Sequence, residues 1–309
     1  MSGAPATAAP AWNRRAERGS GWLIALMFWL TLHLGWRVGR ALLVPITAYF
    51  VVAAPAARRA SLGYLRRAMG RTPGPWLRFR HVFAFSTMLL DRIFFLSGRT
   101  GGYRLEAEGI ATLEAVLTEG RGAILLGAHL GSFEALRAFG RRAPVPVRMM
   151  MYRANRGGFS ARLERLDPDF AAAVIPLGTP EAMLAAREAL GRGEILGILA
   201  DRAPDPGDQP ERLIAVPFLG APAGFPTGPF RLAAALGAPV LLFFGVCTGP
   251  RRYALRFEPF ADRIILPRAG REAALARVVG AYADRLGEMA RAHPLQWFNF
   301  HDVWDDADV

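Results

Sequence analysis

Short apolar runs that alternate with helical patterns constrain the fold of this chain most strongly. The runs of strand length occupy residues 123–129, 147–152, 172–178, 194–201 and 239–248. Helical patterns lie between several of them, as at 179–193 and 225–238. Continuously apolar strands separated by helices are typical of a largely parallel sheet that is covered on both faces. The run at 253–260 alternates more and predicts an antiparallel edge strand. We therefore predict an α/β fold with a mostly parallel central sheet flanked by helices.

The basic residues and the single cysteine exclude several kinds of chemistry. The sequence contains no lysine, so all 38 basic residues are arginine. A Walker-type phosphate loop and a lysine Schiff base both require the missing amine. Cys247 is the only cysteine, which excludes a disulfide framework and a cysteine-rich zinc site. No cluster of histidine, cysteine and acidic residues has metal-ligand spacing, so we expect no bound metal.

The net charge and the hydrophobic content together indicate the kind of partner. A formal charge of +12 favours nucleic acid, an anionic membrane or an acidic ligand, unless the arginines only reflect a solvated surface. Hydrophobic residues make up 52% of the chain, which is unusual for a nucleic-acid binder. We therefore expect an anionic membrane surface as partner and no nucleic acid.

Two charge-free runs near the start of the chain predict a membrane anchor. Residues 1–20 read as a flexible tail, and the runs 19–36 and 41–57 are separated by Arg37 and Arg40. Each run is marginal against the roughly 20 residues of a spanning helix. The segment 21–57 is therefore predicted to be either a spanning helix with its arginines on the cytoplasmic side or a monotopic anchor bent at Pro45. A buried helix of a soluble protein is the remaining alternative.

The segment 58–104 has the pattern of a two-faced helical region. Leu62, Leu65 and Met69 follow one another at helical intervals, with arginines between them. Such a helix suits an anionic bilayer surface, or it presents an ordinary solvated face.

A histidine at the end of the first apolar run of the predicted sheet is the main catalytic candidate. His129 and Glu134 lie too far apart to meet on one helix. If 123–129 is a strand and Ser132 caps a following helix, Glu134 falls in the first helical turn beside His129. A carboxylate there can fix the imidazole tautomer and leave the other nitrogen as a general base. The pair His301 and Asp306 has the same spacing, but no strand, glycine or helix surrounds it.

Four stretches in order resemble one family. Residues 121–136, "RGAILLGAHLGSFEAL", resemble the first motif of the lysophospholipid acyltransferase superfamily, in its branch of bacterial lipid A late acyltransferases (lauroyl- and myristoyl-type). "MMYRANRGG" resembles the second block, and residues 200–241 resemble the block with an acidic residue before a V-P-F-x-G-x-P-A loop. "HPLQWFNFHDVW", from residue 293, resembles the closing Q-W element. The resemblance extends from about residue 20 to 305.

The resemblance implies an acyltransferase domain over 58–309 that moves a fatty acyl group from a thioester to a hydroxyl of a membrane lipid or glycolipid. The donor would be acyl-ACP (acyl carrier protein) or acyl-CoA, with no bound cofactor. The enzyme would work at the cytoplasmic face of the bacterial inner membrane. Its implied catalytic residues are His129, Glu134 and Arg153. The implied substrate-binding residues are Ser132, Tyr152, Asp201, Arg202, Phe218, Gly220 and Gly228.

The acceptor stays open at this point. The closing block continues as "FNFHDVWDD" where the family often has basic residues, a form similar to a subgroup of aryl polyene and other lipid-linked pathways. An aryl polyene or mannosyl lipid is therefore an alternative to lipid A in lipopolysaccharide biosynthesis. The alternative from another class is a non-catalytic scaffold that binds membrane lipid.

Overall fold

The computed structural model describes residues 21–304 apart from 141–145, 152–161, 164 and 203–212. Its helices are α1 (Gly21–Leu34), α2 (Trp36–Ala53), α3 (Pro55–Met69), α4 (Pro75–Leu96), α5 (Ile110–Thr118), α6 (Glu134–Gly140), α8 (Pro168–Ala173), α9 (Pro180–Gly191), α10 (Gly228–Leu236) and α11 (Arg271–Ala292). Its strands are β1 (Arg104–Glu108), β2 (Ala123–Gly127), β3 (Val147–Met151), β4 (Val174–Pro176), β5 (Ile195–Leu199), β6 (Leu213–Phe218), β7 (Ala221–Pro226), β8 (Val240–Gly249) and β9 (Arg252–Ala261).

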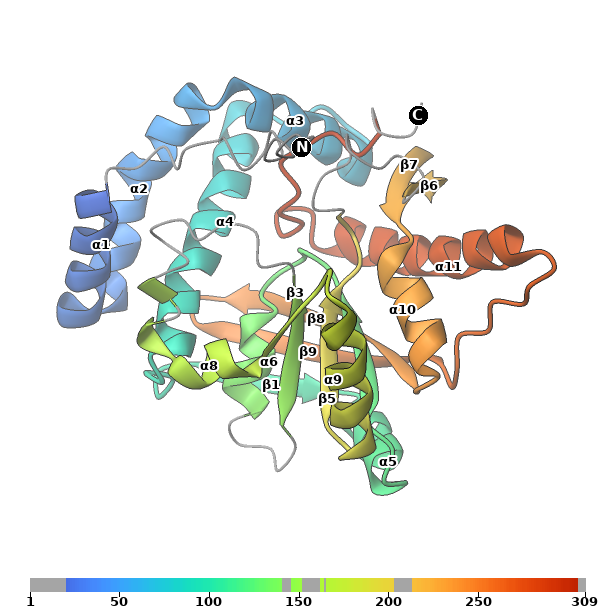
Figure 1. Ribbon diagram of the computed structural model, residues 1–309. Coiled ribbons are helices and arrows are strands. Elements are labelled where there is room, and N and C mark those ends of the chain that lie inside the picture. The colour runs from blue at the N-terminus through green and yellow to red at the C-terminus, as the bar shows by residue number, and fades with distance from the viewer. Residues whose placement is uncertain (1–20, 141–145, 152–161, 164, 203–212, 305–309) are drawn as a thin grey trace, which may run out of the picture.

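A seven-stranded sheet forms the centre of the molecule, in the order β1-β9-β8-β2-β5-β3-β4 (Figure 1). Strands β8, β2, β5, β3 and β4 run parallel to one another. Strand β9 pairs antiparallel with β8 and parallel with β1. The mixed but mostly parallel sheet with flanking helices confirms the predicted α/β fold class.

Both faces of the sheet are buried. Alternate side chains of β2 point to opposite faces and pack into two different hydrophobic clusters. Ile124 and Leu126 belong to a cluster that includes residues of α9, α10 and α11. Ala123 and Leu125 belong to a second cluster with residues of α4, α5 and α6. A strand buried on both sides needs a continuous apolar run, which is what the sequence shows at 123–127.

Three details of the sheet differ from the expectations. The predicted edge strand, β9, has β1 on its outer side, so it is not an edge. Strand β1 was not predicted because its sequence RLEAE is charged and only every second residue is partly buried. The run 172–178 yields only the short β4, since Pro168–Ala173 is helical.

The glycine- and proline-rich segment after residue 212 also differs from the expected loop. It forms a separate antiparallel hairpin of β6 and β7. Leu219 and Gly220 connect the strands, both with positive φ (49° and 87°). Two consecutive residues of positive φ are characteristic of a tight hairpin turn, and glycine adopts this conformation without strain.

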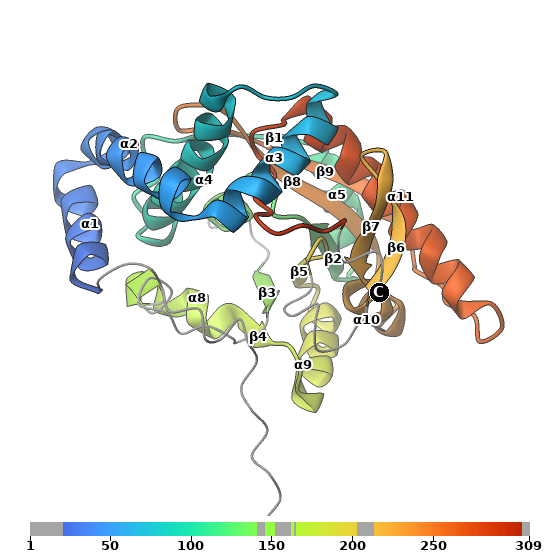
Figure 2. The same ribbon diagram turned by 90° about the horizontal axis from the view of Figure 1, so that it is seen from above.

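The N-terminal helices pack against the body of the protein. Gly35 has φ 86° and interrupts the apolar segment between α1 and α2. Helix α2 continues through Pro45 and is the one helix of the described chain that is long and apolar enough to cross a membrane, judged by length and composition. Phe28 and Leu43 nevertheless lie in the same buried cluster as Leu90 of α4. Figure 2 shows α1 and α2 extending to one side of the sheet.

The amphipathic segment forms the two helices α3 and α4, separated by a break at residues 70–74. Tyr64 and Leu65 of α3 are fully buried against the body, whereas Arg66 and Arg67 are exposed. The apolar face of α3 is therefore covered by protein, and the exposed arginines lie on its outer face.

Candidate active site

His129 lies immediately beyond the carboxyl end of β2 and contacts a carboxylate from the neighbouring strand. Its Nδ1 is 2.8 Å from Oδ1 of Asp201, which follows β5. The carboxyl ends of adjacent parallel strands meet at one edge of the sheet, which is where open α/β sheets bind their ligands. The His129 side chain is 25% exposed and that of Asp201 is 0% exposed. His129 can thus be reached from solvent, whereas Asp201 is buried beneath it.

Asp201 is held by three donors. Its Oδ2 accepts hydrogen bonds from the backbone N–H of His129 and from Nε1 of Trp297, both at 2.9 Å. Burial acts to raise the pKa of Asp201, but the charge and hydrogen bonds of His129, together with the bond from Trp297, outweigh burial and lower this pKa. The carboxylate is therefore ionised at neutral pH and can balance a positive charge on the imidazole.

The second imidazole nitrogen of His129 faces an arginine. Nη2 of Arg202 lies 3.1 Å from Nε2 of His129. A guanidinium can only donate, so Nε2 must accept and its lone pair must be free of a proton. The proton of a neutral imidazole then lies on Nδ1, directed at Asp201. This tautomer is the one that a general base at Nε2 requires.

Glu134 does not occupy the place that the sequence spacing suggested. It begins α6, as expected, but its Oε1 forms an ion pair with Nε of Arg92 in α4 at 2.9 Å. Its Oε2 lies 3.5 Å from the hydroxyl of Ser132, which is at the limit of a hydrogen bond. The carboxylate that is hydrogen-bonded to Nδ1 of His129 belongs to Asp201. The structure therefore places Asp201, and not Glu134, against the imidazole.

The backbone between His129 and Glu134 explains this difference. Gly131 has φ 71° and pairs with Gly245 of β8, and a Cβ at position 131 would overlap the Gly245 carbonyl oxygen. This close approach turns the chain so that α6 packs against α4, as Figure 1 shows for the helix positions. Glu134 is then directed at Arg92 instead of the imidazole.

The other predicted site residues fall into four groups. Arg202 joins His129 and Asp201 at the site. Ser132 and Phe218 are buried, and the Phe218 ring packs against Trp297 with centroids 5.2 Å apart, so Phe218 supports the site from the core. Gly220 lies at the tip of the β6–β7 hairpin and Gly228 begins α10. Tyr152 and Arg153 lie outside the described residues.

Trp297 and His81 are supporting residues that sequence reasoning missed. The buried Trp297 donates to Asp201, and its carbonyl accepts a hydrogen bond from Nε2 of His81 at 2.9 Å. Nδ1 of His81 accepts from the hydroxyl of Ser61 at 2.8 Å. Only the Q-W element gave a sequence signal for Trp297, and nothing local distinguished His81 in α4.

His301, whose spacing to Asp306 matches that of the first pair, also lies near the site. Burial, followed by the charge of Arg202, lowers the pKa of His301 to about 4, with a smaller effect of His129. His301 is therefore a neutral group close to Arg202 at physiological pH.

Among the residues that the structure describes, no group of three or more histidine, cysteine or acidic side chains is arranged to hold a metal ion. The site thus offers a buried carboxylate, an imidazole with an unprotonated Nε2 and a guanidinium.

An imidazole with an accepting Nε2 at the carboxyl edge of an α/β sheet has the geometry that a general base requires. The family comparison makes the class specific. The family described as bacterial lipid A biosynthesis acyltransferase matches residues 80–306, and this chain belongs to it. The match includes every described residue of the His129 site and confirms the predicted acyltransferase class. A comparison with curated proteins found no match.

Proposed function

We propose that the protein transfers a fatty acyl group from a thioester to a hydroxyl of a membrane lipid or glycolipid, with His129 as general base. The observation that carries this proposal is the hydrogen bond from Nδ1 of His129 to Asp201, which leaves Nε2 as the proton acceptor. Membership of the acyltransferase family supplies the reaction class.

In the proposed reaction, Nε2 of His129 takes the proton of the acceptor hydroxyl while the oxygen attacks the thioester carbonyl. The carbonyl carbon becomes tetrahedral, the C–S bond then breaks, and the imidazolium returns its proton to the departing thiolate. The buried carboxylate of Asp201 stabilises the imidazolium. A positioned base of this kind contributes typically about 10²–10⁴ in rate.

In this proposal Arg202 first leaves Nε2 of His129 and then contacts the oxyanion. It must move away from Nε2 when the acceptor hydroxyl approaches, because both would occupy the same hydrogen-bonding direction. After a small displacement its donors reach an oxyanion that forms next to His129. Arg153 remains the second candidate for this contact, since the resemblance assigns it a catalytic role.

Glu134 is proposed as a positioning residue. Its ion pair with Arg92 joins the start of α6 to α4, and both side chains are largely shielded from solvent (13% and 21% exposed). The pair fixes the segment 129–134 on which His129 is carried. Ser132, beside it, is proposed to keep this turn rigid.

Helices α1 and α2 are proposed to attach the enzyme to the cytoplasmic face of the bacterial inner membrane. Large apolar side chains are exposed on them, including Trp22, Trp29, Tyr49 and Val52. Apolar side chains and interfacial aromatics of this kind suit a bilayer. An acyl acceptor stays in the bilayer because each buried methylene contributes about 0.8 kcal/mol. The enzyme must therefore reach the membrane surface.

The donor and acceptor can be tested together. Purified protein is supplied with labelled acyl-ACP or acyl-CoA and total membrane lipids, and the labelled product is analysed by mass spectrometry. The product mass assigns the acceptor to lipid A, an aryl polyene or a mannosyl lipid. A labelled lipid from either donor supports the proposal, and the faster donor identifies the carrier. The absence of lipid product with both donors would contradict it and favour a lipid-binding scaffold.

A further inference from the structure

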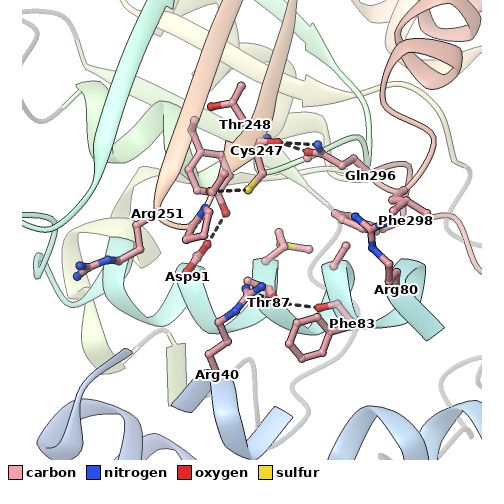
Figure 3. Close-up of a pocket in the computed structure, with 17 residues that line it drawn as sticks. Arg40, Arg80, Phe83, Thr87, Asp91, Cys247, Thr248, Arg251, Gln296 and Phe298 are labelled. Carbon is pink, nitrogen blue, oxygen red and sulfur yellow. Dashed lines mark hydrogen bonds between the residues drawn. The ribbon is translucent and has the colours of Figure 1, made fainter. Parts of the chain in front are cut away.

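A cavity lined by both charged and apolar side chains lies between the N-terminal helices and the body, apart from the His129 side chain. Its volume is about 300 Å³, within the range of small-molecule sites. Helices α2 and α4 form one wall, and the β8–β9 turn with residues 295–298 forms the other. Figure 3 shows side chains of α2 and α4 facing Thr248 and Gln296 across it.

Three arginines line this cavity, contributed by three different elements. Arg40 comes from α2, Arg80 from α4 and Arg251 from the β8–β9 turn. No ion pair joins any of them to a carboxylate within the described residues. Asp91 is the one acidic residue in the lining. The cavity therefore carries more positive than negative charge.

The carboxyl group of Asp91 already accepts hydrogen bonds from three neutral donors. Its Oδ1 accepts from Nε1 of Trp36 at 2.6 Å and from the hydroxyl of Tyr103 at 2.7 Å. Its Oδ2 accepts from the hydroxyl of Tyr253 at 2.6 Å. No hydrogen bond from Arg40 to this carboxylate is formed, so the guanidinium donors keep free positions for an external anion.

Packing holds two of the guanidinium groups in place. The Arg40 guanidinium lies 5.1 Å from the Trp36 ring centroid and donates to the hydroxyl of Thr87 at 3.2 Å. The Arg251 guanidinium lies 5.5 Å from the same ring. Gly102 leaves the space that the Arg251 side chain occupies, because a Cβ there would overlap Nη1. Preorganised arginine forks match the geometry of phosphate oxygens.

We propose that this cavity binds the anionic phosphate group of a membrane lipid through Arg40 and Arg80, with the Arg251 guanidinium directed away from them (Figure 3). Phe83, Met88 and Phe298 give the cavity an apolar part that suits the glycerol and first methylenes of such a lipid. Helix α2, which forms one wall, also carries the exposed apolar residues proposed to face the bilayer. The proposal rests on that membrane attachment for the source of the ligand, but it requires no catalytic step.

The cavity also adjoins the backbone of the catalytic loop. Gly131 and Gln296 line it, and the Phe298 N–H donates to the His129 carbonyl oxygen at 2.7 Å. Gly131 and Gln296 thus form part of the cavity wall. A lipid phosphate bound in the cavity would therefore lie next to the loop that carries His129.

Two double variants of equal charge test the proposal. Arg40→Gln/Arg80→Gln removes two lining arginines. Arg37→Gln/Arg252→Gln removes two exposed arginines, one from α2 and one from the start of β9, that do not line the cavity. The full chain in a non-ionic detergent is titrated with water-soluble dihexanoyl phosphatidylglycerol, and binding is measured by calorimetry. We expect saturable binding that weakens at least tenfold in the first variant and less than twofold in the second.

A milder variant and two soluble ligands complete the test. Arg80 is exposed, so Arg80→Gln preserves the fold and should still weaken binding several-fold. Inorganic phosphate and coenzyme A serve as competitors. Equal weakening in both double variants, or no saturable binding by wild type, would overturn the site. Displacement of the lipid by equimolar inorganic phosphate or coenzyme A would overturn its assignment to a lipid. Because no acyl donor is present, failure of this test leaves the proposed acyl transfer unaffected.

Discussion

At the scale of single residues, the central feature is the choice of carboxylate that faces His129. Asp201 lies 72 positions away in the sequence and reaches Nδ1 because β2 and β5 are neighbours. Glu134 is close in sequence but is directed at Arg92 by the turn at Gly131. Local spacing therefore identified the histidine, while its partner depends on how the strands pair.

Substitution of the two carboxylates separates their functions. We expect Asp201→Asn to lower kcat/KM for acyl transfer by about 10²–10⁴, because an amide cannot balance the imidazolium. Glu134→Gln should lower it by less than about tenfold, since it affects only the ion pair with Arg92. Steady-state acylation kinetics of both variants provide the measurement. Near-normal activity of Asp201→Asn, combined with inactive Glu134→Gln, would return the orienting role to Glu134.

His81 gives a residue-scale prediction about stability. Burial lowers its pKa from 6.5 to about 4, against the smaller raising effect of the Trp297 carbonyl. The unfolded chain binds a proton near pH 6.5 and the folded chain does not, so stability rises with pH between about 4 and 6.5. The contribution is fully present above pH 6.5 and lost as the pH falls through 4. Its size is about 3 kcal/mol.

The pH dependence is measured by urea unfolding from pH 7 down to pH 4. The slope of the unfolding free energy against pH gives the number of protons taken up on unfolding. His81→Gln should lower this number by about one over this range. His301, whose pKa is also lowered to about 4, contributes a similar slope that the variant should retain. An unchanged slope in His81→Gln would contradict the buried neutral state of His81.

At the scale of elements, the packing of α1 and α2 determines what can be removed from the chain. Phe28 and Leu43 are buried with Leu90, and Trp36 donates to the buried Asp91. Deletion of residues 1–57 would remove Phe28, Leu43 and Trp36 and expose Leu90 and Asp91. Burial of one large apolar side chain contributes roughly 1.5–3 kcal/mol, so we expect a loss of several kcal/mol.

Two truncations measured by thermal unfolding in detergent test this expectation. The shorter deletion, of residues 1–20, should leave the melting temperature nearly unchanged because it ends before α1. Deletion of 1–57 should lower the melting temperature by about 10 °C or more. Equal melting temperatures would show instead that the segment 21–57 is an independent anchor attached to a self-sufficient domain starting at 58.

The elements that sequence patterns predicted well are those buried on both sides. Strands β2, β5 and β8 are continuously apolar because no face of them meets water. Strand β1, at the sheet edge, and the proline-containing hairpin β6–β7 lack this signature, and both were missed. The neighbours of β9 also could not be predicted, because strand order is decided by long-range packing and not by local pattern.

At the scale of the whole molecule, the charge distribution and the exposed apolar helices act together. We propose that the formal charge of +12 favours binding of anionic lipid and of an acidic carrier protein. If acyl-ACP is the donor, its kcat/KM should fall steeply as the salt concentration rises from 0.05 to 0.5 M, because screening shortens the range of attraction from about 14 Å to about 4 Å. A pelleting assay with anionic vesicles, run in parallel, separates lipid attachment from donor capture. Salt-independent kinetics would contradict charge-based recruitment.

The central claim is that His129 removes the proton of the acceptor hydroxyl, and one assay tests it most directly. Labelled acyl-ACP and acyl-CoA are incubated with total membrane lipids and either wild type or His129→Ala, with circular dichroism as the folding control. We predict a labelled lipid product with wild type and a loss of at least about 10²-fold in His129→Ala. Equal product from the two folded proteins would contradict the account.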